Sequence, residues 1–262
     1  MNGITLLTDF GIADTYVGQM KGVIAQIAPD ARVIDLTHAV APQDVLAGAI
    51  ELDGAVDAFP AGTIHVAVVD PGVGSARQAM AAQTEHFTFV GPDNGLFTPL
   101  LARSNTWRAV ALSESAYHRP EVSATFHGRD IFAPVAAHLA RGTPLEALGE
   151  RIESPQRLEW PGPQVVESEW RGEVLLIDHF GNCITNFDRS ALAEAGVEEG
   201  GPVTIEAGAA RLAGLAQTFS DVREGEAVAY VGSSGRLEIA VRNGAAAEQL
   251  GLKRGDRVVL KA

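Results

Sequence analysis

The sequence predicts a two-domain α/β protein, with an N-terminal, mostly parallel α/β sandwich domain and a smaller C-terminal β-barrel domain. Three observations lead to this prediction. Short apolar runs alternate with helix-periodic segments over the first 150 residues, which indicates a parallel sheet covered by helices. A proline-rich stretch then interrupts the pattern, and short strand-like runs separated by turn residues follow it. We therefore expect domains at 1–155 and 169–262, joined by a linker at 156–168.

In the N-terminal domain, the first helix has the clearest pattern. Val17, Val23 and Ile24 fall on one side of a helix expected at 14–28, and Pro29 ends it. The run TIHVAVV at 63–69 is rich in β-branched residues, which favours a buried strand. The remaining expected elements are strands at 4–7, 32–36 and 87–90, and helices at 44–59, 94–101 and 128–139.

The C-terminal third has a different pattern. Pro155, Pro161 and Pro163 fall within ESPQRLEWPGPQV, which is typical of a linker. Turn residues then separate short apolar runs at close intervals, as in a small barrel or sandwich. The expected strands lie at 172–178, 201–206, 227–231, 237–241 and 257–260.

Composition limits the kinds of partner. The 262 residues carry a formal net charge of −13, which argues against a nucleic-acid partner, because binding phosphates needs clustered Lys and Arg. No apolar run reaches the ~18 residues of a membrane span, so no membrane partner is expected. The start, MNGITLLTDFG, lacks the pattern of a signal peptide, and a lone cysteine, Cys183, fits a reducing compartment. We therefore expect a cytoplasmic protein with a small-molecule substrate.

Polar residues recur where the predicted strands of the N-terminal domain end. Asp9 follows the first strand, Asp70 the third and Asn94 the fourth, and His127 precedes a helix. Any one of them alone is readily explained as a turn former or helix cap. Several at equivalent ends, each beside glycines, indicate a ligand site beyond the carboxyl ends of the strands.

Three of the polar residues have the chemistry to handle a water proton. The carboxylate of Asp70 can accept a hydrogen bond from water, His127 can orient water or move a proton, and Arg77 can hold the carboxylate in one geometry. For Arg77 a surface ion pair, and for His127 a structural role, are equally open. His38 and Asp44 could join Asp70 and His127 around a metal ion, but no metal-binding motif is present, so no metal is expected.

Two segments of the C-terminal domain could bind polar groups of a ligand. DHFGNCITN begins with Asp178 and contains a predicted turn, whose side chains could either cap the turn or bind a planar base or an amine. SSGRLEIAVRN contains Ser233, Ser234 and Asn243, which could bind a carboxylate or form an ordinary hairpin.

Together these segments resemble the S-adenosylmethionine hydroxide adenosyltransferase family, whose relatives include the fluorinase and chlorinase enzymes. The resemblance runs along essentially the whole chain, and eight motifs in the same order make it specific. These are TDFG at 8–11, DTYVGQMKG at 14–22, DLTH at 35–38, DPGVG at 70–74, GPDNGLF at 91–97, TFHGRDIFAP at 125–134, DHFGN at 178–182 and RN at 242–243.

The resemblance implies a fold, an assembly and a reaction. It implies a seven-stranded α/β domain and a C-terminal barrel, assembled as a homotrimer with sites at subunit interfaces. S-Adenosylmethionine and water would give adenosine and L-methionine by attack at the ribose 5′ carbon, with no cofactor. Asp70, Arg77 and His127 would be the catalytic residues. The substrate-binding residues would be Asp9 (ribose), Asn182 (adenine), Asp178 (methionine amine) and Ser233 (carboxylate), with Asp14, Asn94, Phe180, Ser234 and Asn243.

Three positions favour water over halide as the nucleophile. The halogenating relatives have tyrosine where this chain has Asp70, a Tyr-Ser or Tyr-Gly pair in place of His127-Gly128, and, in the fluorinase, tryptophan in place of Gln43. They also have an insertion that is not evident here between Arg77 and Gly91. The alternatives are a non-hydrolytic adenosine- or S-adenosylmethionine-binding protein, a halogenase and a metal-dependent hydrolase.

Overall fold

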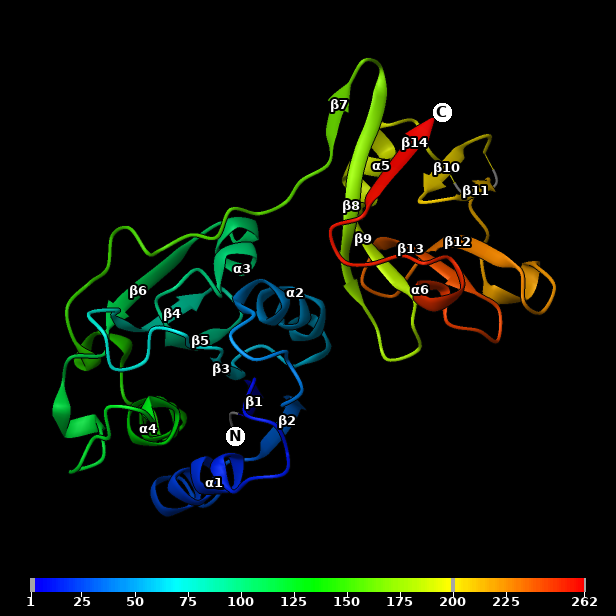
Figure 1. Ribbon diagram of the computed structural model, residues 1–262. Helices are drawn as coiled ribbons and strands as arrows, with labels where there is room; N and C mark the ends of the chain where they lie inside the picture. Colours follow the sequence, from blue (N-terminus) through cyan, green and yellow to red (C-terminus); the bar gives the residue numbers. More distant parts are fainter. Residues whose placement is uncertain (1–2, 199–200, 262) are drawn as a thin grey trace. The chain divides into compact units, whose positions relative to one another are not determined.

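The computed structural model describes residues 3–198 and 201–261, and the chain divides into two compact units, Met1–Trp160 and Pro161–Ala262 (Figure 1). The division falls inside the proline-rich stretch noted in the sequence. Each unit has its own buried apolar core.

Unit 1 is built on a six-stranded sheet with the order β2-β1-β3-β5-β4-β6. β1, β2, β3 and β5 pair in parallel, whereas β4 is antiparallel to both of its neighbours. The mostly parallel sheet predicted from the sequence is therefore confirmed. The strands are β1 (Ile4–Thr8), β2 (Val33–Thr37), β3 (Ile64–Val68), β4 (Ala79–Thr84), β5 (Thr88–Pro92) and β6 (Trp107–Ala111).

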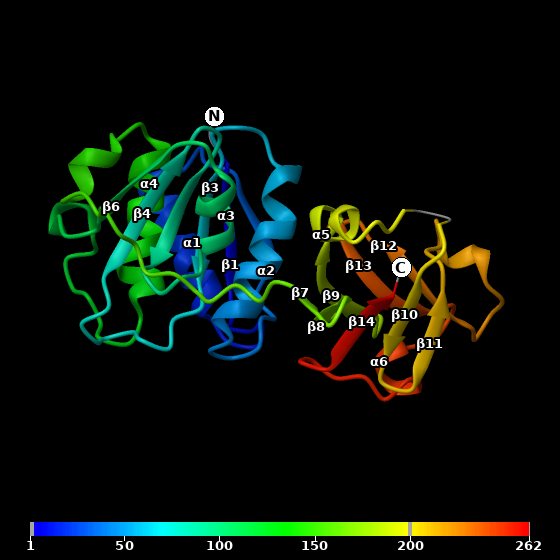
Figure 2. The same ribbon diagram turned by 90° about the horizontal axis from the view of Figure 1, so that it is seen from above.

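Helices cover both faces of this sheet. α1 (Tyr16–Ile27) packs against α4 (Ala133–Ala140) on one face, and α2 (Val45–Ala55) packs against α3 (Thr98–Arg103) on the other (Figures 1 and 2). The apolar side of α1 predicted from its periodicity is the side that is buried. The other helical segments are a π-helix at Gly128–Phe132 and 3-10 turns at Val56–Ala58, Ser115–Tyr117 and Leu145–Leu148.

Two strands of unit 1, β4 and β6, were not predicted from the sequence. β4 reads AMAAQT, and its small side chains give neither an alternating pattern nor β-branched enrichment. The resemblance implies seven strands, whereas the described residues form six in this sheet, and Arg151 makes an isolated antiparallel bridge with Val110 of β6.

Unit 2 is an antiparallel sheet of eight strands that curls into a barrel, as predicted. Its order is β11-β10-β14-β8-β9-β13-β12, with β7 paired to β8. Ala216 bridges Tyr230 of β12 just after β11, which draws the two ends of the sheet together. The strands are β7 (Gln164–Val166), β8 (Glu169–Ile177), β9 (Cys183–Asp188), β10 (Thr204–Ala207), β11 (Ala210–Ala213), β12 (Ala227–Val231), β13 (Arg236–Val241) and β14 (Arg257–Lys261).

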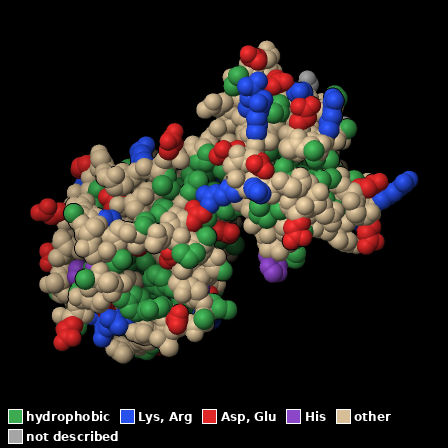
Figure 3. All heavy atoms as spheres, viewed as in Figure 1, with side chains coloured by type: hydrophobic (Ala, Val, Ile, Leu, Met, Phe, Trp, Pro, Cys, Tyr) green, Lys and Arg blue, Asp and Glu red, His purple; other side chains and the backbone are tan. Residues whose placement is uncertain are grey.

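Two short α-helices, α5 (Arg189–Glu194) and α6 (Ala246–Gln249), and a 3-10 turn at Phe219–Asp221 complete unit 2, and none of them was expected from the sequence. Over the end of this unit that carries β7, β8 and β14, acidic and basic side chains are intermixed (Figure 3), with Lys261 bonded to Glu169 and Glu206. None of the helices in the described part of the chain is long and apolar enough to cross a membrane.

Candidate active site

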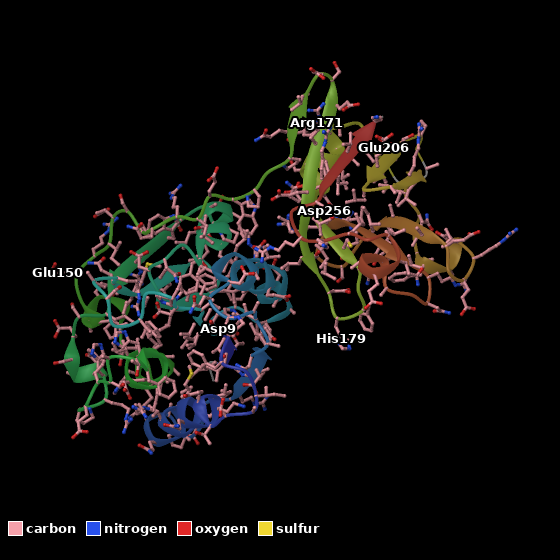
Figure 4. All side chains as sticks on the ribbon, viewed as in Figure 1. Asp9, Glu150, Arg171, His179, Glu206 and Asp256 are labelled. Atoms are coloured by element: carbon pink, nitrogen blue, oxygen red, sulfur yellow. The ribbon has the colours of Figure 1, made fainter. Side chains whose placement is uncertain are left out.

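A cavity of about 380 Å³ lies beyond the carboxyl ends of β1 and β3 in unit 1. Parallel strands bring their carboxyl ends to one edge of a sheet, and ligand sites form there. The cavity collects three residues predicted from strand-end position, Asp9, Asp70 and His127. Asp9 lies close to the β1 end of the sheet (Figure 4).

Asp70 and Arg77 form a nearly buried ion pair at this edge. The Arg77 Nε donates to Asp70 Oδ1 over 3.0 Å, and the Arg77 Nη2 donates to Asp70 Oδ2. The side chains of Asp70 and Arg77 are 5% and 8% exposed, respectively. The interpretation of Arg77 as a member of a surface ion pair is therefore wrong. A pair of parallel hydrogen bonds fixes the plane of the carboxylate.

His127 is the third member of this group. The Arg77 Nη2 lies 3.1 Å from His127 Nδ1. A guanidinium has only donors, so Nδ1 accepts this hydrogen bond, and the proton of the neutral ring is then on Nε2. Burial and the Arg77 charge lower the pKa of His127, which keeps the ring neutral at pH 7. Asp70 and His127 line the cavity and Arg77 lies behind them, in contact with both.

The segment around His127 is held by contacts that were not predicted from the sequence. His127 precedes the π-helix Gly128–Phe132, a helix type that is frequent at functional sites. A Cβ at Gly128 would lie 3.1 Å from the Phe10 ring, so a larger side chain would crowd it. Asp130 is fully buried and accepts hydrogen bonds from the Ser123 backbone N–H and from Arg129. Its position within the TFHGRDIFAP segment was the available signal.

The loop after β1 carries Asp9 and is fixed at two points. The Gln43 backbone N–H donates to Asp9 Oδ2 over 2.8 Å, and Gln43 has φ 66°, a conformation unusual for a non-glycine residue. Thr8 Oγ1 accepts from the Phe10 backbone N–H and lies 2.8 Å from His38 Nδ1. Gln43, one of the positions at which the resemblance implies a difference from the fluorinase, therefore contacts Asp9 through its backbone.

Three aromatic rings form one wall of the cavity. Phe10, Tyr16 and Phe126 contact one another edge to face, with ring centroids 5.2–6.1 Å apart. This wall was not predicted, although its members lie within the TDFG, DTYVG and TFHG segments. It provides an apolar surface beside the carboxylates of Asp9 and Asp70.

Two predicted binding residues of unit 1 do not line this cavity. Asn94 Nδ2 donates to the Val69 carbonyl over 2.9 Å, and its Oδ1 accepts from the Leu96 backbone N–H, so its amide joins the loops that follow β3 and β5. Asp14 is exposed near the start of α1. Within this unit, Asn94 therefore stabilises the two loops, and Asp14 lies on the surface.

Unit 2 has a larger cavity, of about 850 Å³. It is lined by all six binding residues predicted in this unit, together with Tyr230 and Glu238, which were not predicted. The six are Asp178, Phe180, Asn182, Ser233, Ser234 and Asn243.

Asp178 organises the turn between β8 and β9. Its Oδ1 accepts from the backbone N–H groups of Phe180 and Asn182, and its Oδ2 accepts from the Asn182 side-chain amide over 2.8 Å. The neighbouring His179 extends from the end of this turn (Figure 4). Phe180 is 73% exposed, so this turn presents a large apolar residue to solvent.

The described residues contain no group of three His, Cys, Asp or Glu side chains that could hold a metal ion. The four residues considered for such a site are engaged elsewhere: His38 pairs with Thr8 and Asp35, Asp44 caps α2, and Asp70 and His127 contact Arg77.

The chain is similar to several known proteins. The chain is 44% identical to an (R)-S-adenosyl-L-methionine hydrolase from Thermus thermophilus, over 97% of this chain and 98% of that protein. It is 30% identical to a fluorinase from Nocardia brasiliensis, over 98% of this chain and 96% of that protein. Its fold matches the crystal structure of an uncharacterized conserved protein from Thermotoga maritima, with a TM-score of 0.93 and 38% identity. The match covers 99% of this chain and 100% of that protein.

The family comparison covers both units. Residues 4–149 match the SAM hydroxide adenosyltransferase N-terminal domain, and residues 172–259 match the C-terminal domain of the same family. Because both domains of this family match in order along the chain, the chain belongs to the SAM hydroxide adenosyltransferase family.

Proposed function

We propose that this chain hydrolyses S-adenosyl-L-methionine to adenosine and L-methionine. The relatives that are 42–44% identical over nearly the full length are named (R)-S-adenosyl-L-methionine hydrolases. The sulfonium of the substrate is a stereocentre, and we propose that the (R) epimer is the substrate here too. The observation that carries the proposal is the Asp70–Arg77–His127 group at the edge of the unit 1 cavity.

The reaction needs a positioned water molecule more than it needs an acid. The water oxygen forms a bond to the ribose 5′ carbon, and the bond from that carbon to sulfur breaks, so that sulfur leaves as the neutral thioether of methionine. The water loses one proton in the process. Because the sulfonium is a good leaving group, positioning the water in line with the carbon–sulfur bond is the main task, and it can supply ~7–11 kcal/mol.

The tautomer of His127 suggests how the two cavity-lining residues divide this task. With its proton on Nε2, the ring can donate a hydrogen bond to the water oxygen and orient a lone pair, but it cannot accept a proton there. The Asp70 oxygens each keep a lone pair beyond the bonds from Arg77, so Asp70 is the proton acceptor in our proposal. Arg77 is the positioning residue for both.

The rest of the substrate would be held by the groups assigned through the family resemblance. Asp9 would bind the ribose hydroxyls, Asn182 the adenine, Asp178 the methionine amine and Ser233 the carboxylate. In support, the oxygens of Asp9 and Asp178 are already oriented by backbone N–H groups, so little order is lost on binding.

Incubation of the purified protein with each sulfonium epimer in ¹⁸O-water tests the proposal. We expect adenosine and methionine in equal amounts, with ¹⁸O in the 5′ hydroxyl of adenosine and faster consumption of the (R) epimer. Asp70→Asn should lower turnover by about 10²- to 10⁴-fold. Asp57→Asn, at an exposed ion pair with Arg103, is the matched control and should leave turnover unchanged. Absence of adenosine with excess enzyme would contradict the proposal, and so would unlabelled adenosine.

The same assay separates hydrolysis from its rivals. Repeating it in high chloride or fluoride should yield no 5′-halogenated adenosine. Binding of substrate without any product would instead identify a non-hydrolytic binding protein.

We also propose that the active protein is a homotrimer whose substrate contacts come from neighbouring subunits, as the resemblance implies. Sedimentation of the purified chain tests the trimer. Mixing Asp70→Asn with Asp178→Asn subunits tests the sharing of sites: shared sites would restore part of the turnover, because some sites would combine two intact surfaces. Sites contained within one subunit would show no recovery.

A further inference from the structure

The cavity of unit 2 is unbalanced in charge. Of the described residues that line it, Asp178 and Glu238 are acidic and none is Lys, Arg or His. The negative charge of Asp178 disfavours the ionised form of the buried Glu238. A positively charged group bound between them would remove this cost, so the cavity is suited to a cationic ligand group.

Glu238 lies inside this cavity and not on the outer surface of the barrel. It is in the middle of β13, directly across from Tyr230 of β12, and only 8% of it is exposed. The Tyr230 hydroxyl donates to Glu238 Oε2 over 2.7 Å. The other oxygen, Oε1, packs under Gly232, where a Cβ would overlap it. Glu238 therefore lies directly beneath the turn that carries Ser233 and Ser234.

The hydrogen-bonding capacity of Asp178 is nearly used up. A carboxylate can accept about four hydrogen bonds, and Asp178 already accepts three, from the backbone N–H groups of Phe180 and Asn182 and from the Asn182 amide. One position is left. A primary ammonium group has three N–H donors, so Asp178 alone would leave two of them without a protein partner in the cavity.

We propose that Glu238 is a second, specificity-determining contact for the α-ammonium group of the substrate, shared with Asp178. This rests on the proposed function, since it assigns a substrate group to the same site. Glu238 Oε1 and the free lone pair of Oε2 supply the acceptors that Asp178 lacks. The α-ammonium and α-carboxylate are attached to one carbon, so their partners must be adjacent, and Glu238 lies beneath the Ser233–Ser234 turn assigned to the carboxylate.

The electrostatics of Glu238 agree with this role. Burial, and then the charge of Asp178, raise the pKa of Glu238, against the opposing effect of the Tyr230 hydrogen bond. A bound ammonium would favour the ionised carboxylate, and binding would weaken as the pH falls and Glu238 becomes protonated. A carboxyl group whose only role was to bond Tyr230 would not couple to the ligand in this way.

Glu238→Gln tests the proposal because it keeps the shape of the side chain and an acceptor for Tyr230 while removing the charge. We expect KM for S-adenosyl-L-methionine to rise by about 10- to 100-fold, with kcat within about threefold of wild type. Inhibition by adenosine, which lacks the amino acid group, should be unchanged. Glu206→Gln, the same substitution in a surface ion pair with Lys261 of the same unit, is the matched control and should leave KM unchanged.

A sulfonium analogue without the α-amino group gives the decisive comparison. The proposal requires wild type and Glu238→Gln to bind this analogue equally well, measured by calorimetry. Equal losses for substrate and analogue would overturn it, since a merely structural role weakens both, and so would an unchanged KM. If Glu238→Gln does not fold, Glu238→Asp and Glu238→Ala are compared instead. Glu238→Asp keeps the charge, so it must prefer the substrate over the analogue without the α-amino group by a larger factor than Glu238→Ala does. If wild type makes no adenosine, the proposed function fails, and the calorimetric comparison still decides the role of Glu238.

Discussion

Arg77→Lys is the substitution that tests the site geometry most directly. Lysine keeps the positive charge but replaces a planar fork by a single ammonium, so it cannot make the bidentate contact with Asp70 and also reach His127. Two of the three hydrogen bonds are lost. At about 1.5–3 kcal/mol for each bond to a charged group, the upper bound on the loss of unfolding free energy is about 3–6 kcal/mol, reduced by the charge that remains.

The effect on turnover should be separable from the effect on stability. A displacement of catalytic groups by about 1 Å can cost about 100-fold in rate, and we expect a loss of at least that size in adenosine release at saturating substrate. Urea unfolding gives the stability change. Arg108→Lys is the control: Arg108 is 54% exposed in its ion pair with Glu146, and its replacement should change stability by less than about 0.5 kcal/mol and leave turnover intact. Turnover of Arg77→Lys within threefold of wild type would refute the bridging role of Arg77.

Three further predictions concern the fold and the chemistry. Gly91→Ala should lower the unfolding free energy by about 1–3 kcal/mol, because the new Cβ would overlap the Ala67 carbonyl oxygen on the neighbouring strand. Gly54→Ala in α2 is the control: its new Cβ would meet open space, so this variant should be neutral or stabilising in the same urea titration. Burial lowers the pKa of His65 from 6.5 to about 4, so the unfolded chain takes up the proton first and stability is lost as the pH falls through this window. Between pH 7 and pH 5 the loss should be about 2 kcal/mol, and His65→Phe should not show this contribution; equal pH dependence of the two proteins would contradict the assignment. Turnover should be insensitive to EDTA, and a loss that added metal restores would revive the metal-dependent alternative.

The predictable parts of the fold are those where side-chain chemistry repeats with the period of the element. β3 was predictable because Ile64, Val66 and Val68 are β-branched and the strand is buried on both sides. The centre of β4 is also buried, but two of its three residues are alanines. Alanine has a low β-propensity, so its presence does not predict a strand. The antiparallel direction of β4 follows from the short β4–β5 hairpin, which could be inferred only once β4 was known.

The site was predictable where its members are close in sequence. Asp70 and Arg77 lie in one loop, and their pairing could be anticipated, whereas the contact of Arg77 with His127 spans 50 residues and depends on the whole sheet. The tautomer of His127 could not be predicted from the sequence, because it follows from the contact between Arg77 Nη2 and His127 Nδ1 in the folded protein. Glu238 was missed because a charged residue in a strand is usually taken to face water, and only its position opposite Tyr230 puts it inside the cavity.

The reversed direction of β4 has a consequence for how this site can change. β3 ends and β4 begins at the same edge of the sheet, because β4 is antiparallel to β5 and β5 is parallel to β3. A parallel β4 would have needed a crossover of a dozen or more residues to return to the opposite edge. As it is, Asp70 and Arg77 belong to one short loop that crosses the end of β5. A single exchanged segment, residues 70–77, could therefore carry both halves of the ion pair from one relative to another while every strand of the sheet keeps its own sequence.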